Sequence, residues 1–75
     1  MSRYTINSLL YRVKTDSIFR ERFMSHREAL LSEWEITEEE KTALLAWDMQ
    51  KLNEQGAYLH SLVRVNRLLK EAAPR

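Results

Sequence analysis

Two histidines, several carboxylates and several serines are the residues of this 75-residue chain that could do chemistry. A metal site needs several His, Cys, Asp or Glu donors that are brought together by suitable spacing. His26 and His60 are far apart, and neither has a second histidine at helical distance. The sequence therefore predicts no metal site, and we expect both histidines at the surface.

The carboxylates and serines also lack the arrangement of an active site. Two carboxylates that act as acid and base need a pocket that gives them different environments. Here the acidic residues gather at expected helix starts, as in the run 38–40, where the positive end of the helix dipole favours anions. No serine lies in a glycine-flanked turn, and no glycine-rich loop is present to hold phosphate. The sequence predicts no catalytic residue.

Composition narrows the class of protein further. Twelve basic and eleven acidic residues give a net charge of +1, so no strong field favours nucleic acid as a partner. A late basic cluster is interpreted as stabilising a helix end; it consists of Arg64, Arg67, Lys70 and Arg75. The chain has no cysteine, which excludes disulfides. It shows no signal peptide or membrane span, so we expect a cytoplasmic protein without a membrane partner.

Apolar residues recur at helical spacing along the chain, and no segment alternates with the period of a strand. We therefore predict one all-α domain over residues 1–75, a small compact bundle of five to six short helices. The expected helices cover residues 5–14, 16–24, 25–34, 37–47, 48–56 and 57–72, the last being the longest. Phe19 and Phe23 should point into the core, and Trp34 and Trp47 should also belong to it.

Several residues have the types and spacing that start or end a helix. Thr37 and Glu40 have the spacing of a capping box, in which two side chains satisfy the first backbone N–H groups of a helix. Ser25 and Glu28 repeat that spacing, and Ser2 or Thr5 could cap the first helix. Asp48 can open the fifth helix. Gly56, the single glycine, falls where a left-handed residue would close that helix.

The last expected helix is apolar around a wide arc. We predict that Leu59, Leu62, Val63 and Leu69 form one face, with Tyr58, Val65 and Leu68 on its flank. Such a helix is either wrapped by its own bundle or covered by another subunit. The predicted partner interface consists of Tyr58, His60, Leu62, Val65 and Leu68.

Taken together, the order of these segments resembles the LigA-like family, the small alpha subunits of protocatechuate-type extradiol dioxygenases. The resemblance rests on D-S-I-F-R-E-R-F from Asp16, on E-A-L-L-S-E-W from Glu28, and above all on I-T-E-E-E-K-T-A-L-L-A-W-D-M-Q-K-L-N-E-Q-G-A from Ile36 to Ala57. It covers roughly residues 5–65. Thr37, Glu40, Asp48 and Gly56 stand where the family has them.

The resemblance implies a helical partner of a larger subunit that carries non-haem iron(II) and cleaves a catechol ring next to the diol. This chain would bind no cofactor itself and would help to complete or cover that active site. Longer family members have further residues at both ends, including a C-terminal segment that approaches the substrate. We therefore expect no substrate-binding residue in this chain.

Two alternatives remain open at this point. The same compact fold resembles the binding domain of borosin peptide precursors, which docks on a methyltransferase, so the chain could be a recognition module for another enzyme. It could also be a free-standing homo-oligomer that associates through its last helix.

Overall fold

The computed structural model describes residues 2–72, which form six α-helices and no strand. The helices are α1 (Ser2–Thr15), α2 (Ser17–Ser25), α3 (Arg27–Leu31), α4 (Glu38–Ala46), α5 (Met49–Glu54) and α6 (Leu59–Ala72). The predicted all-α bundle is confirmed. The last helix is not the longest by itself, because α1 and α6 both have 14 residues.

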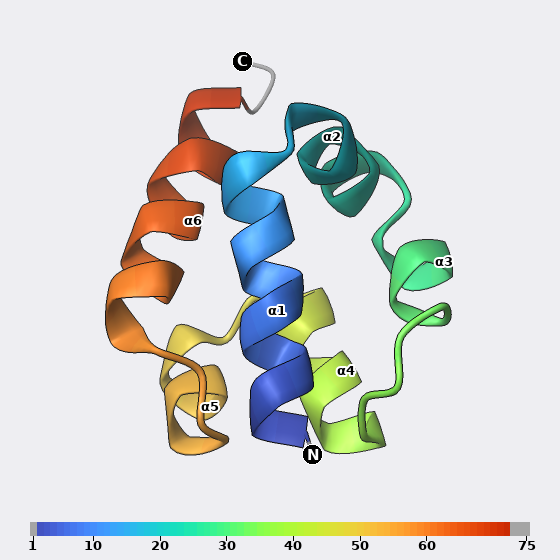
Figure 1. Ribbon diagram of the computed structural model, residues 1–75, viewed down its shortest axis with the longest axis vertical. Coiled ribbons are helices and arrows are strands. Elements are labelled where there is room, and N and C mark those ends of the chain that lie inside the picture. The colour runs from blue at the N-terminus through green and yellow to red at the C-terminus, as the bar shows by residue number, and fades with distance from the viewer. Residues whose placement is uncertain (1, 73–75) are drawn as a thin grey trace.

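Helix α1 lies across the middle of the broad face that Figure 1 presents, with α6 on one side of it and α2 and α3 on the other. Helices α4 and α5 lie behind this layer. Helix α1 packs most extensively against α6 and then against α2. The first and last helices of the described chain therefore meet side by side.

The core lies between these two layers. Every described helix contributes buried apolar side chains to it, namely Ile6, Leu9, Leu10, Val13, Phe19, Phe23, Leu30, Leu31, Ala43, Leu44, Leu52, Leu62 and Val65, joined by Ala57 from the α5–α6 turn. The expectation that Phe19 and Phe23 point inward is confirmed. Trp34 and Trp47 are partly buried against the core, and their rings meet Phe19 and Phe23 edge to face at centroid distances of 5.9 and 6.1 Å.

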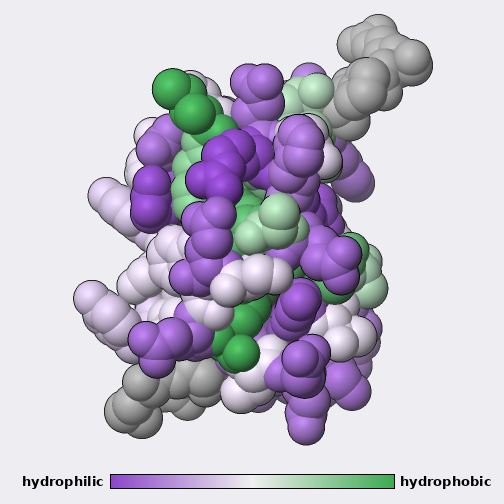
Figure 2. Space-filling view, turned by 90° about the vertical axis from the view of Figure 1, so that its right-hand side faces the viewer, coloured by the Kyte–Doolittle hydropathy of each residue, from purple (hydrophilic) through white to green (hydrophobic). Residues whose placement is uncertain are grey.

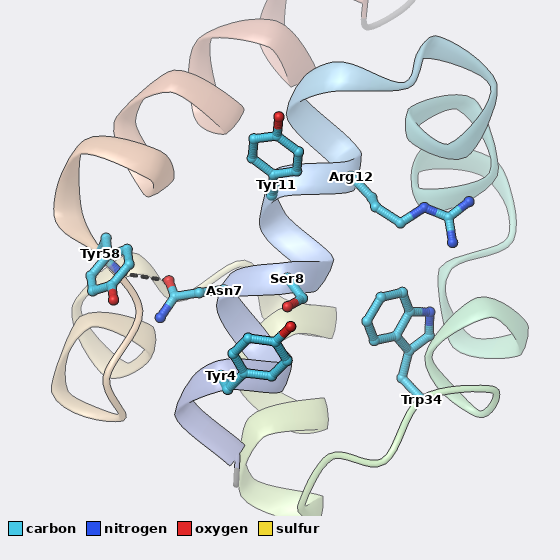
Figure 3. Close-up of a pocket in the computed structure, with 7 residues that line it drawn as sticks. All are labelled: Tyr4, Asn7, Ser8, Tyr11, Arg12, Trp34 and Tyr58. Carbon is cyan, nitrogen blue, oxygen red and sulfur yellow. Dashed lines mark hydrogen bonds between the residues drawn. The ribbon is translucent and has the colours of Figure 1, made fainter.

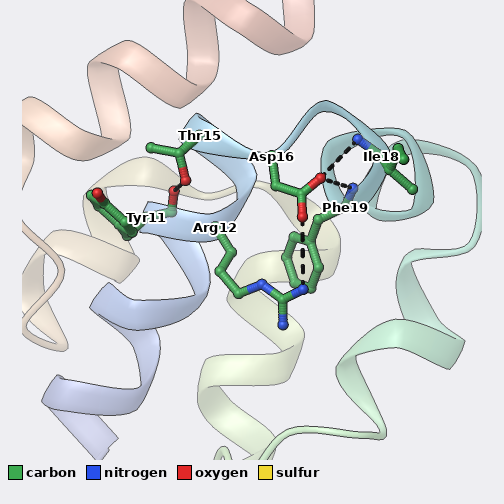
Figure 4. A network of polar contacts seen from close by, with 6 residues as sticks. All are labelled: Tyr11, Arg12, Thr15, Asp16, Ile18 and Phe19. Carbon is green, nitrogen blue, oxygen red and sulfur yellow. Dashed lines mark hydrogen bonds and ion pairs between the residues drawn. The ribbon is translucent and has the colours of Figure 1, made fainter.

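Three of the predicted helix starts are confirmed. The backbone N–H of Glu40 donates to the Thr37 hydroxyl at 3.1 Å, and the N–H of Thr37 donates to the Glu40 carboxylate at 2.8 Å, which completes the capping box of α4. Asp48 caps α5 by accepting from the N–H of Lys51. Asp16 caps α2 in the same way (Figure 4).

The end of α5 is also confirmed. Gly56 has a φ of 109°, a value that favours glycine because it has no Cβ. Its N–H donates to the carbonyl of Asn53, and the N–H of Ala57 donates to the carbonyl of Leu52. This is the Schellman pattern of a helix C-terminus, and Leu52 and Ala57, the positions that commonly make an apolar contact in it, are both buried.

Helix α4 ends with the same pattern of hydrogen bonds but without a glycine. Trp47 takes the left-handed conformation there, with a φ of 52°. The N–H of Asp48 donates to the carbonyl of Ala43 at 2.9 Å. A large residue pays a steric penalty in this region. Contacts of the Trp47 ring offset this steric penalty, because the ring packs on Phe23 and its Nε1 donates to Oδ1 of Asn66 on α6 at 3.0 Å.

Two predicted helix caps are wrong. Helix α2 continues through Ser25, whose hydroxyl donates to the carbonyl of Glu21, so it is not available to cap α3. The N-cap of α3 is His26, which makes no side-chain capping bond. Helix α1 begins at Ser2 rather than near residue 5, so Thr5 lies inside the helix and Ser2 is its first residue rather than the residue before it.

The predicted faces of α6 are corrected as well. Leu62 and Val65 are buried and Leu69 is partly buried, so the core stripe follows positions three and four apart along the helix. Leu59 and Val63, which were predicted to share a face with Leu62 and Leu69, are 58% and 48% exposed. The reason is that α6 packs against the rest of the bundle, α1 above all, with Leu62 and Val65 buried in the core, and this orientation leaves Leu59 and Val63 on its outer side.

Two arginines tie helix ends together. The guanidinium of Arg27 donates to the carbonyls of Phe23 at the end of α2 and of Leu44 at the end of α4, at 2.9 and 3.0 Å, and its carbon lies 4.2 Å from the centre of the Phe23 ring. Its partial burial lowers the pKa of Arg27 below its ordinary value. Arg20 donates in the same manner to the carbonyls of Val13 and Lys14 at the end of α1. Both cations stand where the helix dipoles are negative.

Candidate protein interface

The five residues of the predicted partner interface do not share one surface. Tyr58 and His60 are exposed, and their rings stack at a centroid distance of 5.8 Å with an angle of 9°. Leu68 is half-buried. Leu62 and Val65 are fully buried in the core, so their side chains are not at the surface. A partner that contacts this end of α6 would meet Tyr58 and His60 first.

A second set of exposed aromatic residues lies on the outer side of α1. Tyr4 is 77% exposed and Tyr11 is 60% exposed. They are seven positions apart, which places them on the same side of a helix about 10 Å apart along its axis. Ser8 lies between them, and its small side chain leaves the space between the two rings open (Figure 3).

These residues line a groove of about 530 Å³ together with neighbours from both sides of α1. Its lining consists of Tyr4, Asn7, Ser8, Tyr11, Arg12, Trp34 and Tyr58. In Figure 3 Tyr4 and Tyr11 stand at the two ends, Trp34 and Tyr58 stand on opposite sides, and Ser8 lies between them. Four aromatic rings therefore surround a polar floor on α1.

Asn7 fixes one side of this groove. Its side-chain nitrogen donates to the carbonyl of Gly56 at 3.1 Å, and its side-chain oxygen accepts from the N–H of Tyr58 at 3.0 Å. A single amide on α1 thus binds the backbone on both sides of Ala57, in the turn between α5 and α6. This contact places Tyr58 beside α1, because the backbone of Tyr58 is held directly (Figure 3).

Among the described side chains that line this groove, Arg12 alone is charged. Its guanidinium carbon lies 4.4 Å from the centre of the Phe19 ring, and its Nη2 lies 3.8 Å from Oδ2 of Asp16 (Figure 4). Asp16 already accepts from two backbone N–H groups through its other oxygen. The side chain of Arg12 is 54% exposed, so several of its donors face solvent.

The side of the molecule that carries α2 and α3 differs in character. Figure 2 shows a mostly hydrophilic surface there, with small and separate hydrophobic areas. An exposed ion pair joins Arg22 of α2 to Glu33, with 2.9 Å between Nη2 and Oε2. A solvated surface of this kind is ordinary for a small domain. The aromatic groove is therefore the more distinctive surface.

The residues of the described chain that could hold a metal ion are dispersed. Among residues 2–72, no three His, Cys, Asp or Glu side chains lie close enough together to hold a metal ion. Within the same part of the chain, no helix combines the length and the apolar character that crossing a membrane requires.

Sequence reasoning found Tyr58 but missed Tyr4, Tyr11 and the groove between them. A signal was present, because the apolar face of α1 is complete with Ile6, Leu9 and Val13. Two tyrosines on the opposite face have no place in the core. Large aromatic residues on the outer face of a helix are typical of protein interfaces.

The comparisons with known proteins agree with the resemblance that the sequence shows. The chain matches the family described as "Aromatic-ring-opening dioxygenase LigAB, LigA subunit" over residues 6–74. No significant match is found among curated proteins or among solved structures. Because the family match covers nearly the whole chain, this protein belongs to the LigA family, the LigA subunits of aromatic-ring-opening dioxygenases.

Proposed function

We propose that this chain is a non-catalytic small subunit that docks on a separate, larger subunit of an extradiol aromatic ring-cleavage dioxygenase. The larger subunit would carry the non-haem iron(II) and perform the ring cleavage. The small subunit would help to complete or cover the active site and would stabilise the assembly, because a partner that binds only the folded state adds to its stability.

The observation that carries this proposal is the family match over residues 6–74. The structure supports it with the exposed aromatic side chains Tyr4, Tyr11 and Tyr58. Burial of exposed tyrosines against a partner lowers the free energy of the complex, and fixing a tyrosine side chain costs little conformational entropy. A surface of this kind favours a docking role.

Coexpression with the extradiol dioxygenase large subunit of the same organism tests the proposal. The two chains should elute together in size-exclusion chromatography, and ring cleavage of a catechol with added iron(II) should be faster with both chains than with the large subunit alone. An unrelated helical protein of similar size, added in place of this chain, should give no increase. Absence of a complex, or full activity of the large subunit alone, would contradict the proposal.

A further inference from the structure

We infer that the aromatic groove on α1 is the docking surface of this chain, and that it receives a segment of the larger subunit in which an apolar or aromatic side chain stands next to a carboxylate. This inference rests on the proposed function and adds the surface, the occupant and its charge. It moves the main interface from α6 to α1, with Tyr58 shared between the two.

The walls of the groove indicate an apolar or aromatic side chain. Tyr4, Tyr11 and Tyr58 are each more than half exposed, so a side chain inserted between them would remove a large aromatic area from water. The floor is the small residue Ser8, which leaves room for insertion. Phenol hydroxyls at the rim can donate to backbone carbonyls of the inserted segment.

The charge of the groove indicates a neighbouring carboxylate. Arg12 lines the groove, and no acidic residue does so among the side chains that the structure describes. Asp16, with which Arg12 forms an ion pair at 3.8 Å, is already engaged as the cap of α2, so the guanidinium keeps donors for a second carboxylate. Lys14 lies nearby, with its Nζ 5.4 Å from the centre of the Tyr11 ring. Charge complementarity therefore favours an acidic segment over a basic one.

The position of the groove also fits an interface. The molecule measures 33 × 24 × 20 Å, and Figure 1 looks onto the face spanned by the two longer dimensions. It is the broadest face of the molecule and therefore offers a partner the most area. Helix α1 and its groove lie in the middle of it (Figures 1 and 3), where the strongest contacts of an interface concentrate.

Affinity measurements with the large subunit test the aromatic walls. Tyr4→Ala and Tyr11→Ala should each weaken binding about 30-fold, as expected for central aromatic contacts. Ile18→Ala is the matched control, since Ile18 on α2 is 74% exposed and does not line the groove. It should change the dissociation constant less than about twofold. Equal losses in all three variants, or no loss in the tyrosine variants, would overturn the inference.

Removal of the positive charge of Arg12 tests whether the partner segment places a carboxylate beside it. Arg12→Gln should weaken binding about tenfold and make the affinity less sensitive to salt, because it removes an ionic contact. Arg64→Gln, on the outer side of α6, removes the same charge from a residue outside the groove and should leave both quantities unchanged. An affinity and salt dependence of Arg12→Gln equal to those of the natural chain would show that no carboxylate is bound there.

Chemical labelling of cysteines introduced in and outside the groove gives a test that does not depend on losses of affinity. The chain has no cysteine, so Ser8→Cys introduces one thiol at the floor and Glu21→Cys introduces one on the exposed side of α2. In the complex, maleimide labelling of the first thiol should slow at least tenfold, while labelling of the second should stay constant. If the complex forms and the groove thiol stays reactive, this inference fails and the proposed function stands. If the natural chain forms no complex, both fail.

Discussion

The N–H of Tyr58 donates to the side-chain oxygen of Asn7 at 3.0 Å, although the two residues are 51 positions apart. The same amide donates to the carbonyl of Gly56 at 3.1 Å. Helix α1 therefore fixes the turn that leads into α6, because the Asn7 side chain satisfies two backbone groups that lie outside any helix. The aromatic groove depends on this contact, because it sets the position of one of its four rings.

Asn7→Ala should lower the free energy of unfolding by about 1–2 kcal/mol, since two backbone groups lose their partner. Ser8→Ala is the control, because it changes the next residue of α1 to alanine, and the Ser8 side chain makes no hydrogen bond among residues 2–72. It should stay within ~0.5 kcal/mol of the natural chain. Urea unfolding followed by tryptophan fluorescence measures both. Equal stability of the two variants would contradict a fixing role for Asn7.

Trp47 and Asn66 should be energetically coupled through the hydrogen bond that joins them. Trp47→Phe keeps an aromatic ring but removes the Nε1 donor, and Asn66→Ala removes the acceptor. Each change should cost about 1 kcal/mol or more, and the double variant should cost less than their sum by about 0.5–1.5 kcal/mol. A complete double-mutant cycle by chemical unfolding measures the coupling. Strict additivity would show that the bond contributes nothing.

Gly56 should resist substitution because its φ of 109° is unfavourable for residues with a Cβ. Gly56→Val should destabilise the domain by at least ~1 kcal/mol, and Gly56→Asn should cost less, since asparagine tolerates positive φ better than a β-branched residue. Thermal unfolding by circular dichroism ranks the three proteins. A valine variant as stable as the natural chain would mean that the turn can be built with another backbone.

Arg27 should matter more for stability than an exposed arginine. Arg27→Met removes the donors that join the ends of α2 and α4, and we expect a loss of about 2 kcal/mol. In a domain of this size that corresponds to a melting temperature roughly 10 °C lower. Arg64→Met, an exposed change on α6, should shift the melting temperature by no more than a few degrees. Similar shifts in both variants would contradict this assignment.

The features that could be predicted from the sequence are those fixed by residues three or four positions apart. The capping box of Thr37 and Glu40, the cap at Asp48 and the turn at Gly56 all depend on such local spacing. The same spacing at Ser25 and Glu28 led to a wrong prediction of a cap for α3, because the preceding helix α2 extends through Ser25. Local spacing cannot decide between two helices that compete for one residue.

What the sequence could not reveal depends on contacts between distant segments. The outward position of Leu59 and Val63 follows from how α6 packs on α1. The groove needs Trp34 and Tyr58 to be brought to Tyr4 and Tyr11, which no local pattern encodes. The family resemblance, in contrast, could be recognised from the sequence, because it rests on the order of the helix signals.

The pairing of α1 with α6 has a consequence for synthesis. Helix α1 leaves the ribosome before the other described helices, and α6, against which it packs most extensively, is made after all of them. The apolar side of α1, with Ile6, Leu9 and Val13, is therefore incompletely covered until α6 has been made. Long-range pairings of this kind close late in folding, because the intervening chain must first be ordered. The aromatic groove therefore exists only on a chain whose translation has passed Tyr58, and a nascent chain shorter than that cannot present the complete groove to a partner.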